Sequence, residues 1–361
     1  MNSKVFRLSK LFLKRNHHLC ISRNSLCNIS TSMERVFSGI QPTGTLHLGN
    51  YFGALKKWVE LQETCGSVLY SIVDLHSITL PQDPKILHRN ILEVTACLLA
   101  CGINPQKSIL FQQSKVSQHA ELAWVLGCMT TMARLGHLPQ FKEKSASVKD
   151  IPLGIFVYPV LQSADILVYK ATKVPVGEDQ LQHLQLAQHL AKLFNSKYGK
   201  LFPHPKALIN DDCTARLRSL RDPTKKMSKS EPDPKSRIDL TDSEEVILEK
   251  VKKAVTDFES AVTWDPKNRP GVSNLIAIHC GMTGKTPEEI VQDAQGLDTG
   301  KYKLVVADAI NKVLQPIREE TMRLLKDPPF LEQILEDGSM KASSIAEDTW
   351  ESVRKLVGLS S

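Results

Sequence analysis

The sequence predicts an α/β protein, with a parallel β-sheet in its first two thirds and a helical final third. Two observations carry this prediction. Between residues 35 and 199, short apolar segments rich in β-branched residues alternate with longer segments of helical periodicity. From Asp242 onward the pattern is almost wholly that of amphipathic helices. Alternating strands and helices favour a parallel sheet whose ligands bind at the carboxyl ends of the strands.

The expected strands share short apolar runs bounded by polar or turn-forming residues. In chain order they cover residues 36–40, 67–79, 107–114 and 173–180. The first is followed by the turn Pro42-Thr43-Gly44, and helical spacing begins at Leu48. A strand, a tight turn and a helix start in succession leave free backbone N–H groups where an anion can bind.

The expected helices share apolar residues spaced three or four positions apart. They cover residues 83–105, 117–147 (where helix gives way to a polar stretch), 158–171, 181–199, 243–258 and 302–325. Gly102 closes the first of them. The pattern changes after the lysine-bearing loop at residues 219–235, which places a domain boundary near residues 236–242.

Residues 1–33 contain six Lys or Arg and no Asp or Glu, with apolar residues between the charges. This composition predicts a mitochondrial transit peptide, and a disordered basic tail is the alternative. Without these cations the net charge falls from +7 to +1, so an anion-binding surface elsewhere must be a local patch. No apolar run reaches the roughly 18 residues that span a bilayer, so no membrane partner is expected.

The eight cysteines include no C-x-x-C pair and no matching histidine spacing, so free thiols and no metal site are expected. Free thiols suit a reducing compartment such as the mitochondrial matrix.

One candidate site is the segment "GTLHLGN", residues 44–50. His47, Gly49 and Asn50 stand at the expected helix start, where His47 could donate a hydrogen bond to a phosphate oxygen. Because Gly49 has no side chain, a flat ring could approach its backbone closely. A common helix cap is the alternative interpretation.

The second candidate is "KKMSKS", residues 225–230, in a proline-flanked loop without an apolar stripe. Lys226 and Lys229 present ammonium groups, and Ser228 and Ser230 add donors. Such a loop can close on a polyphosphate and neutralise the charge that builds up on a leaving group. A solvated cluster of surface lysines is the alternative.

Together and in this order, the two segments resemble the HIGH-like and KMSKS signatures of the class I aminoacyl-tRNA synthetases. Further segments narrow the resemblance to the tryptophanyl-tRNA synthetases: "FSGIQPTG", "IVDLHSIT", "QFKEKSA", "YPVLQSADIL", "VPVGEDQ" and "DPTKKMSKS". The resemblance covers nearly everything after Arg35, and the basic leader makes the chain similar to mitochondrial members. Asn50 stands where the general motif has a second histidine, as is common in the tryptophan and tyrosine branch.

The resemblance implies a Rossmann-like catalytic domain over residues 34–235, with a helical insertion and the KMSKS loop at 226–230. It implies a helical domain that binds the tRNA anticodon over residues 241–361. The implied reaction activates L-tryptophan with ATP to tryptophanyl-adenylate, releases pyrophosphate and transfers tryptophan to mitochondrial tRNA(Trp). Mg²⁺ would accompany ATP, held by phosphates and water more than by protein. The implied assembly is a homodimer, with one tRNA lying across both subunits.

The resemblance also implies roles for single residues. His47, Lys144, Lys226 and Lys229 would be catalytic, through alignment and charge stabilisation. Asp165 would accept the indole N–H, which rejects rings that lack this donor. The residues implied for ATP are Gln41, His47, Leu48, Gly49, Asn50, Gly177, Glu178, Asp179, Leu217, Lys226, Met227, Ser228, Lys229 and Ser230. Weaker candidates for the tryptophan pocket are Phe37, Tyr158, Gln162, Val174, Val176 and Gln180.

Several other side chains are interpreted as structural. Asp74 and His76 are explained by alternate strand positions and a loop start. His183 and His189 fall on different helix faces and are not a metal pair. Trp124 is expected to be a packing residue.

Three other functions share some of these features. A tyrosyl-tRNA synthetase has both signature motifs, but "VPVGEDQ" and Asp165 favour tryptophan. A nucleotidyltransferase that makes a small-molecule adenylate shares the fold without an obvious need for the helical region after Asp242. A non-catalytic RNA-binding paralogue would have no reason to keep His47, Lys226 and Lys229 together.

Overall fold

The computed structural model describes residues 34–138, 150–209, 214 and 216–361. The expected transit peptide and Lys144 lie outside the described residues. Residues 33–361 form one compact unit. Within the described ranges, no helix combines the length and apolar character needed to cross a membrane.

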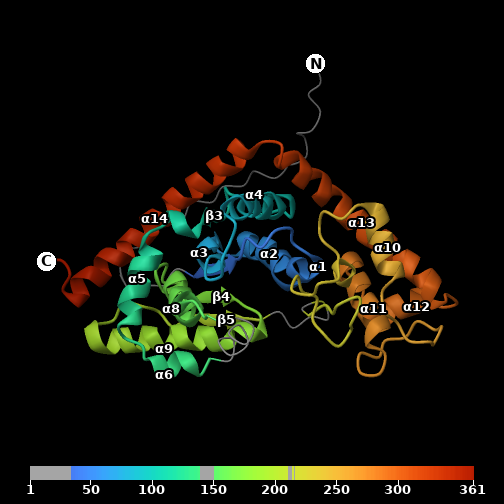
Figure 1. The fold of residues 1–361 in the computed structure, drawn as a ribbon, viewed down its shortest axis with the longest axis horizontal. Helices are drawn as coiled ribbons and strands as arrows, with labels where there is room; N and C mark the ends of the chain where they lie inside the picture. The colour runs from blue at the N-terminus through green and yellow to red at the C-terminus, as the bar shows by residue number, and fades with distance from the viewer. Residues whose placement is uncertain (1–33, 139–149, 210–213, 215) are drawn as a thin grey trace, which may run out of the picture. The chain divides into compact units, whose positions relative to one another are not determined.

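The unit is built around a five-stranded parallel sheet with the strand order β3-β2-β1-β4-β5 (Figure 1). The strands are β1 (Arg35–Ile40), β2 (Ser67–Ile72), β3 (Ile109–Gln112), β4 (Lys173–Pro175) and β5 (Lys206–Leu208). From β1 the chain first builds outward to β2 and β3, and then returns to the other side of β1 with β4. Ligands of open parallel sheets bind at such a reversal, outside the carboxyl ends of the strands.

The predicted fold class is confirmed, with differences at the strand ends. The strand expected over 67–79 stops at Ile72, because the chain turns into the short helix α3 (Asp74–Ser77). The strand expected over 173–180 stops at Pro175 and is followed by the 3-10 turn η3 (Glu178–Gln180). Strand β5 was not predicted, since its three residues follow the proline-rich "FPHP" and show no apolar run.

The helices of the sheet region follow the expected order. They are α1 (Leu48–Asn50), α2 (Lys56–Thr64), α4 (Pro84–Ala100), α5 (Gln118–Gly127), α6 (Met132–Gly136), α8 (Leu153–Leu167) and α9 (Leu181–Tyr198). A π-helical turn, η1 (Tyr51–Leu55), joins α1 to α2. Asp83 caps α4 by accepting from the backbone N–H groups of Lys85 and Ile86, as short polar side chains do at helix starts.

The final third is helical, as predicted. It contains α10 (Glu244–Lys252), α11 (Pro270–Thr283), α12 (Pro287–Asp293), α13 (Thr299–Leu324) and α14 (Pro328–Val357). Helix α14, red in Figure 1, packs against the edge strand β3. A Cβ atom at Gly338 would lie 1.8 Å from the carbonyl oxygen of Leu110, so only glycine permits this approach. The helix therefore covers a strand edge that would otherwise be open to pairing.

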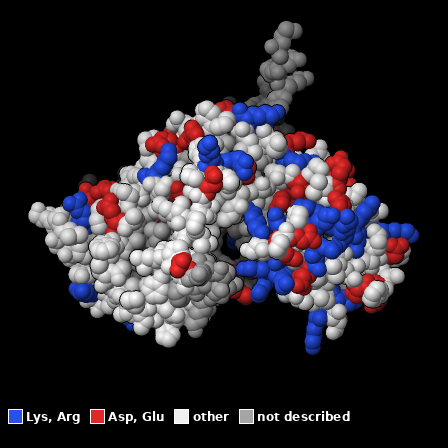
Figure 2. Space-filling model, in the orientation of Figure 1, with Lys and Arg blue, Asp and Glu red and all other residues white. Residues whose placement is uncertain are grey.

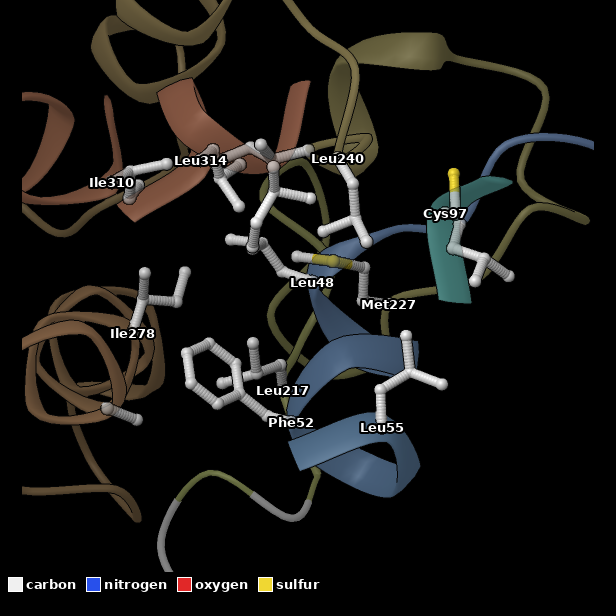
Figure 3. Packing of buried hydrophobic residues seen from close by; sticks show 14 of the residues in the cluster. Leu48, Phe52, Leu55, Cys97, Leu217, Met227, Leu240, Ile278, Ile310 and Leu314 are labelled. Carbon is white, nitrogen blue, oxygen red and sulfur yellow. The ribbon is translucent and has the colours of Figure 1, made fainter. Parts of the chain in front are cut away.

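One hydrophobic core joins the sheet region to the C-terminal helices. The same buried cluster contains Leu48 of α1, Leu240, which precedes α10, and Ile310 of α13. Met227 of the KMSKS loop lies among them (Figure 3). The hydrophobic core therefore continues across residues 236–242, where the sequence pattern changes. The division into a catalytic and a tRNA-binding part stays a prediction about function.

Candidate active site

A cavity of about 900 Å³ lies where β1 and β4 end. Eight of the predicted site residues line it: Gln41, Asp165, Gly177, Glu178, Asp179, Lys226, Ser228 and Ser230. All six weaker pocket candidates line it as well: Phe37, Tyr158, Gln162, Val174, Val176 and Gln180. The cavity therefore brings together the strand ends, helix α8, turn η3 and the KMSKS loop.

Asp165 forms one buried wall of the cavity, on helix α8, with a relative exposure of 1%. Its Oδ1 accepts hydrogen bonds from Gln113 Nε2 at 2.7 Å and His119 Nδ1 at 2.6 Å, and its Oδ2 from His76 Nε2 at 2.8 Å. Burial alone would raise the pKa of Asp165, but the hydrogen bonds and charges of His119 and His76 outweigh it and hold the pKa below its ordinary value. Asp165 is therefore an ionised acceptor.

A chain of hydrogen bonds orders the wall beside Asp165. His183 of α9 has its Nε2 3.2 Å from the Tyr158 hydroxyl and its Nδ1 3.0 Å from Gln180 Oε1. Gln162 Nε2 donates to the same Gln180 oxygen at 3.3 Å. The contact of His183 with two cavity residues was not predicted from the sequence.

His47 stands immediately before α1, where it is buried and touches Gly49. A Cβ atom at Gly49 would lie 2.8 Å from His47 Cε1 and 2.9 Å from Nδ1. The flat ring that was expected to approach Gly49 is therefore, in this structure, the imidazole of His47. Burial, with the charges of Lys229 and Arg237, lowers the pKa of His47 to about 4. The imidazole is thus neutral at pH 7, and its Nδ1 has no hydrogen-bond partner among the described residues.

The KMSKS loop is docked on the turn that precedes α1. The Met227 N–H donates to the Leu217 carbonyl at 2.9 Å, and the Met227 side chain is buried. Lys229 Nζ donates to the Gly44 carbonyl at 2.8 Å and to the Thr43 carbonyl at 3.3 Å. The loop has no apolar stripe in the sequence, yet Met227 anchors it in the core (Figure 3). The two signature segments do lie against each other.

The remaining predicted site residues lie away from the cavity surface. Leu48, Leu217 and Met227 are buried in the core, so only their backbone atoms can serve a ligand in this conformation. Asn50 caps the turn, since its Oδ1 accepts from the His47 backbone N–H at 3.1 Å.

Of two residues that the sequence pattern explained as structural, His76 lies at the site and Asp74 lies beside it on the same helix. Asp74 and His76 are on α3 and not in a strand, and both are buried. His76 lines the cavity and binds Asp165, while Asp74 accepts from Gln112 and Ser114. Their position directly after a buried strand was a usable signal, since functional groups gather at strand carboxyl ends.

Within the described part of the chain, no cluster of three or more His, Cys, Asp or Glu side chains could hold a metal ion.

The chain belongs to the class I tRNA synthetases, because the family model described as tRNA synthetases class I (W and Y) matches residues 30–315. It is therefore an aminoacyl-tRNA synthetase, with the parallel sheet and cavity described above. Among its relatives, the tryptophan–tRNA ligase of Wolinella succinogenes is 45% identical over 327 residues, which cover 90% of this chain and 99% of the relative. The mitochondrial tryptophan–tRNA ligase of Caenorhabditis elegans is 44% identical over 344 residues, covering 93% of this chain and 94% of the relative.

A solved structure of tryptophanyl-tRNA synthetase from Campylobacter jejuni, complexed with ADP and tryptophan, has the same fold. Its TM-score to this chain is 0.78 at 33% identity, over 90% of this chain and 99% of that one.

Proposed function

We propose that this chain is a tryptophan–tRNA ligase that activates L-tryptophan with ATP and transfers it to tRNA(Trp). The observation that carries the proposal is one cavity lined by two unlike sets of groups. Asp165 offers a buried acceptor beside apolar residues, and Lys226, Ser228 and Ser230 offer a cation and hydroxyl donors. The similarity to an enzyme whose structure holds ADP and tryptophan supports the same pair of ligands here.

In the first step, a carboxylate oxygen of tryptophan attacks the α-phosphorus of ATP. The bond from the α-phosphorus to the oxygen bridging the β-phosphorus breaks, and pyrophosphate leaves with that electron pair. Such a reaction needs alignment and charge stabilisation more than a base. Mg²⁺ enters as part of the Mg·ATP substrate, held mainly by phosphates and water.

Three parts of the chain align the nucleotide. Gly177, Glu178 and Asp179 face the cavity at η3, where carboxylates suit the ribose hydroxyls. Lys226 faces the phosphates from the KMSKS loop. His47 stays neutral, and its Nδ1, which has no hydrogen-bond partner among the described residues, suits a hydrogen bond to a phosphate oxygen.

Lys229 reaches the triphosphate by exchanging its present partners. Its ammonium now rests on the carbonyls of Thr43 and Gly44, which are neutral acceptors. Phosphate oxygens are charged and form stronger hydrogen bonds with an ammonium group. ATP therefore draws Lys229 from the turn onto the β,γ-phosphates, where it stabilises departing pyrophosphate.

Tryptophan is selected by its ring donor and its shape. Asp165 accepts the indole N–H, and a ring without a donor leaves this buried carboxylate with an unmet acceptor. Tyrosine also carries a donor, so its rejection depends on the walls around Phe37, Tyr158 and Val174.

In the second step, a ribose hydroxyl at the tRNA 3′ end attacks the adenylate carbonyl carbon and AMP leaves. Residues 241–361 bind the anticodon. In Figure 2, Lys and Arg gather over the region of α10 to α13, with acidic side chains among them. Such local basic surface suits contact with RNA phosphates, although the chain beyond its leader is nearly neutral.

The enzyme acts in the mitochondrial matrix as a homodimer. The basic, acid-free leader and the similarity to a mitochondrial relative support the location. Trp124, Met132 and Leu153 support the dimer, because they are 77%, 78% and 72% exposed. They lie on α5, α6 and α8, which pack on one another, and large exposed apolar groups mark association surfaces.

The test is ATP–pyrophosphate exchange by the purified protein with each of the twenty amino acids. Exchange that depends on tryptophan alone is expected. Exchange driven by tyrosine would make the chain a tyrosyl-tRNA synthetase, and no exchange with any amino acid would favour the non-catalytic RNA-binding alternative.

A further inference from the structure

A buried histidine outside the cavity links two of the cavity's walls. His119, on α5, has no solvent exposure and does not line the cavity. Its Nδ1 lies 2.6 Å from Asp165 Oδ1, and its Nε2 lies 2.7 Å from the hydroxyl of Tyr169. Both ring nitrogens are thus engaged by other buried groups.

The chemistry of these partners shows what His119 presents to Asp165. An ionised carboxylate only accepts hydrogen bonds, so His119 Nδ1 carries a hydrogen toward Asp165. Burial raises the pKa of Tyr169 well above its ordinary value, so its hydroxyl keeps its proton. The Tyr169 hydroxyl lies 2.7 Å from Nε2 and engages the far side of the ring, which holds the orientation in which Nδ1 faces Asp165.

Tyr169 also touches a second residue of the cavity lining. Its ring stacks on Phe37, with the ring centroids 5.5 Å apart and the planes 18° apart. Phe37 of β1 lines the cavity, as Asp165 does. A continuous path therefore runs from Phe37 through Tyr169 and His119 to Asp165, with every member buried.

We propose that His119 is a positioning residue for amino-acid recognition, which aims the Asp165 carboxylate into the cavity and ties it to the Phe37 wall through Tyr169. This inference rests on the proposed function, since it assigns Asp165 to the amino-acid substrate. Oδ1 is held by His119 and Gln113, whereas Oδ2 accepts one hydrogen bond among the described residues, from His76. A carboxylate oxygen has room for two such bonds, so Oδ2 keeps a site for a ligand N–H.

Two substitutions separate the two nitrogens of His119. In His119→Asn, the amide nitrogen occupies the place of Nδ1 and can still donate to Asp165. In His119→Gln, the amide reaches the place of Nε2, so contact with Tyr169 survives and the donor to Asp165 is lost. His88→Gln is the matched control, because His88 is exposed on α4 and pairs only with Glu332 in the described chain.

The measurement is pyrophosphate exchange, with KM for tryptophan and KM for ATP determined separately. We expect His119→Gln to raise KM for tryptophan about tenfold or more, the effect of losing a hydrogen bond to a charged group, while KM for ATP is unchanged. His119→Asn should stay within about threefold of wild type. Tyr169→Phe should raise KM for tryptophan by a smaller factor, because it removes one of the two hydrogen bonds that hold the ring while the donor to Asp165 remains.

A double substitution tests whether His119 acts through Asp165. In an Asp165→Asn background, adding His119→Gln should change KM for tryptophan less than about twofold, since the group that His119 positions is already altered. The proposal is overturned if the two His119 variants behave alike, if KM for ATP rises in parallel with KM for tryptophan, or if the double variant shows fully additive effects.

Failure of this inference is distinct from failure of the proposed function. If wild type does not activate tryptophan, the proposed function fails before any variant is compared. If wild type activates tryptophan and His119→Gln keeps its KM, only the role of His119 is lost. If thermal melting shows that His119→Gln is unfolded, Tyr169→Phe and His119→Asn are compared instead. An unchanged KM for tryptophan in Tyr169→Phe then overturns the proposed link between Tyr169 and Asp165 through His119.

Discussion

Gly49 shows how the absence of one side chain sets the position of another. The His47 imidazole occupies the space that a Cβ atom at Gly49 would need. Across from it, Lys229 crosses from the KMSKS loop to the Pro42–Gly44 turn, and its charge contributes to the lowered pKa of His47. These residues form one unit, although about 180 positions separate them in the sequence.

Gly49→Ala should lower the rate of adenylate formation about 10- to 100-fold, because the new methyl group displaces the His47 ring and small misplacements are costly in catalysis. Pyrophosphate exchange measures the rate. Gly66→Ala is the control, since a Cβ there meets no atom of the described residues within 4 Å. Full turnover in Gly49→Ala would show that the position of His47 does not matter.

Lys229→Ala should lower turnover in adenylate formation about 10²- to 10³-fold, while KM for ATP changes little, because its charge matters most as pyrophosphate departs. Pyrophosphate-exchange kinetics give both constants. Lys225→Ala is the matched control in the same loop, since Lys225 does not line the cavity and pairs with Asp222 at 3.0 Å. An unchanged turnover would remove Lys229 from the mechanism.

The pH dependence of ATP use should also report Lys229. Burial lowers the pKa of Lys229 to about 8, so its ammonium is charged below that pH and neutral above it. We expect kcat/KM for ATP, which reflects the free enzyme, to fall as the pH rises through about 8. In Lys229→Arg the side chain stays charged, and this fall should move to higher pH. A fall that persists near pH 8 in the variant would assign it to another group.

At the scale of elements, helix α14 and strand β3 depend on each other. The helix brings its backbone against the carbonyl of Leu110, which is possible only because residue 338 is glycine. Glycine normally weakens a helix interior by roughly 0.5–1 kcal/mol relative to alanine. Here the close contact with the strand outweighs that cost.

Gly338→Ala should therefore reduce the free energy of unfolding by about 1–3 kcal/mol or more, because the methyl group forces helix and strand apart. Denaturant unfolding measures this change. Gly127→Ala, at the end of α5, should be neutral or stabilising, since a Cβ there meets no atom of the described part of the chain within 4 Å. A stabilised Gly338→Ala would contradict the contact described here.

At the scale of the whole molecule, the catalytic cavity and the C-terminal helices share one buried core. Leu240 follows the KMSKS loop and packs with Leu314 of α13 and Leu48 of α1 (Figure 3). The Leu240 N–H donates to the Leu46 carbonyl at 2.7 Å, next to His47. A shift of the C-terminal helices on binding tRNA would therefore move the backbone at the start of α1, next to His47.

Association of two chains should depend on the surface of α5, α6 and α8. The protein is expected to be a dimer by light scattering, and Trp124→Glu with Leu153→Glu should yield a monomer, because charges disfavour burial of this apolar surface. Phe258→Glu is the control, since Phe258 is a fully exposed aromatic in the C-terminal region. A dimer that survives the double change, or dissociates with Phe258→Glu, would place the interface elsewhere. Trp124 was expected to pack in the core, and its exposure corrects that interpretation.

Local sequence was enough for much of the fold because the periodicities of strands and helices are properties of short segments. Strands β1 to β3 and helices α4, α9 and α13 follow from them. The periodicity did not predict the end of β2. Residues 74–77 continue the apolar alternation of the strand, but in the tertiary structure they form α3. Strand β5 is too short to show a period.

By itself, the sequence determined the alternating α/β order, the helical final third and the two signature segments, since each depends on residues close together in the chain. Only the tertiary structure decided that Met227 is a core residue, that Lys229 rests on Gly44, and that His76 and His119 meet at Asp165. These contacts join residues from 46 to 185 positions apart. No local pattern records such pairings, because they arise when separate elements pack against one another.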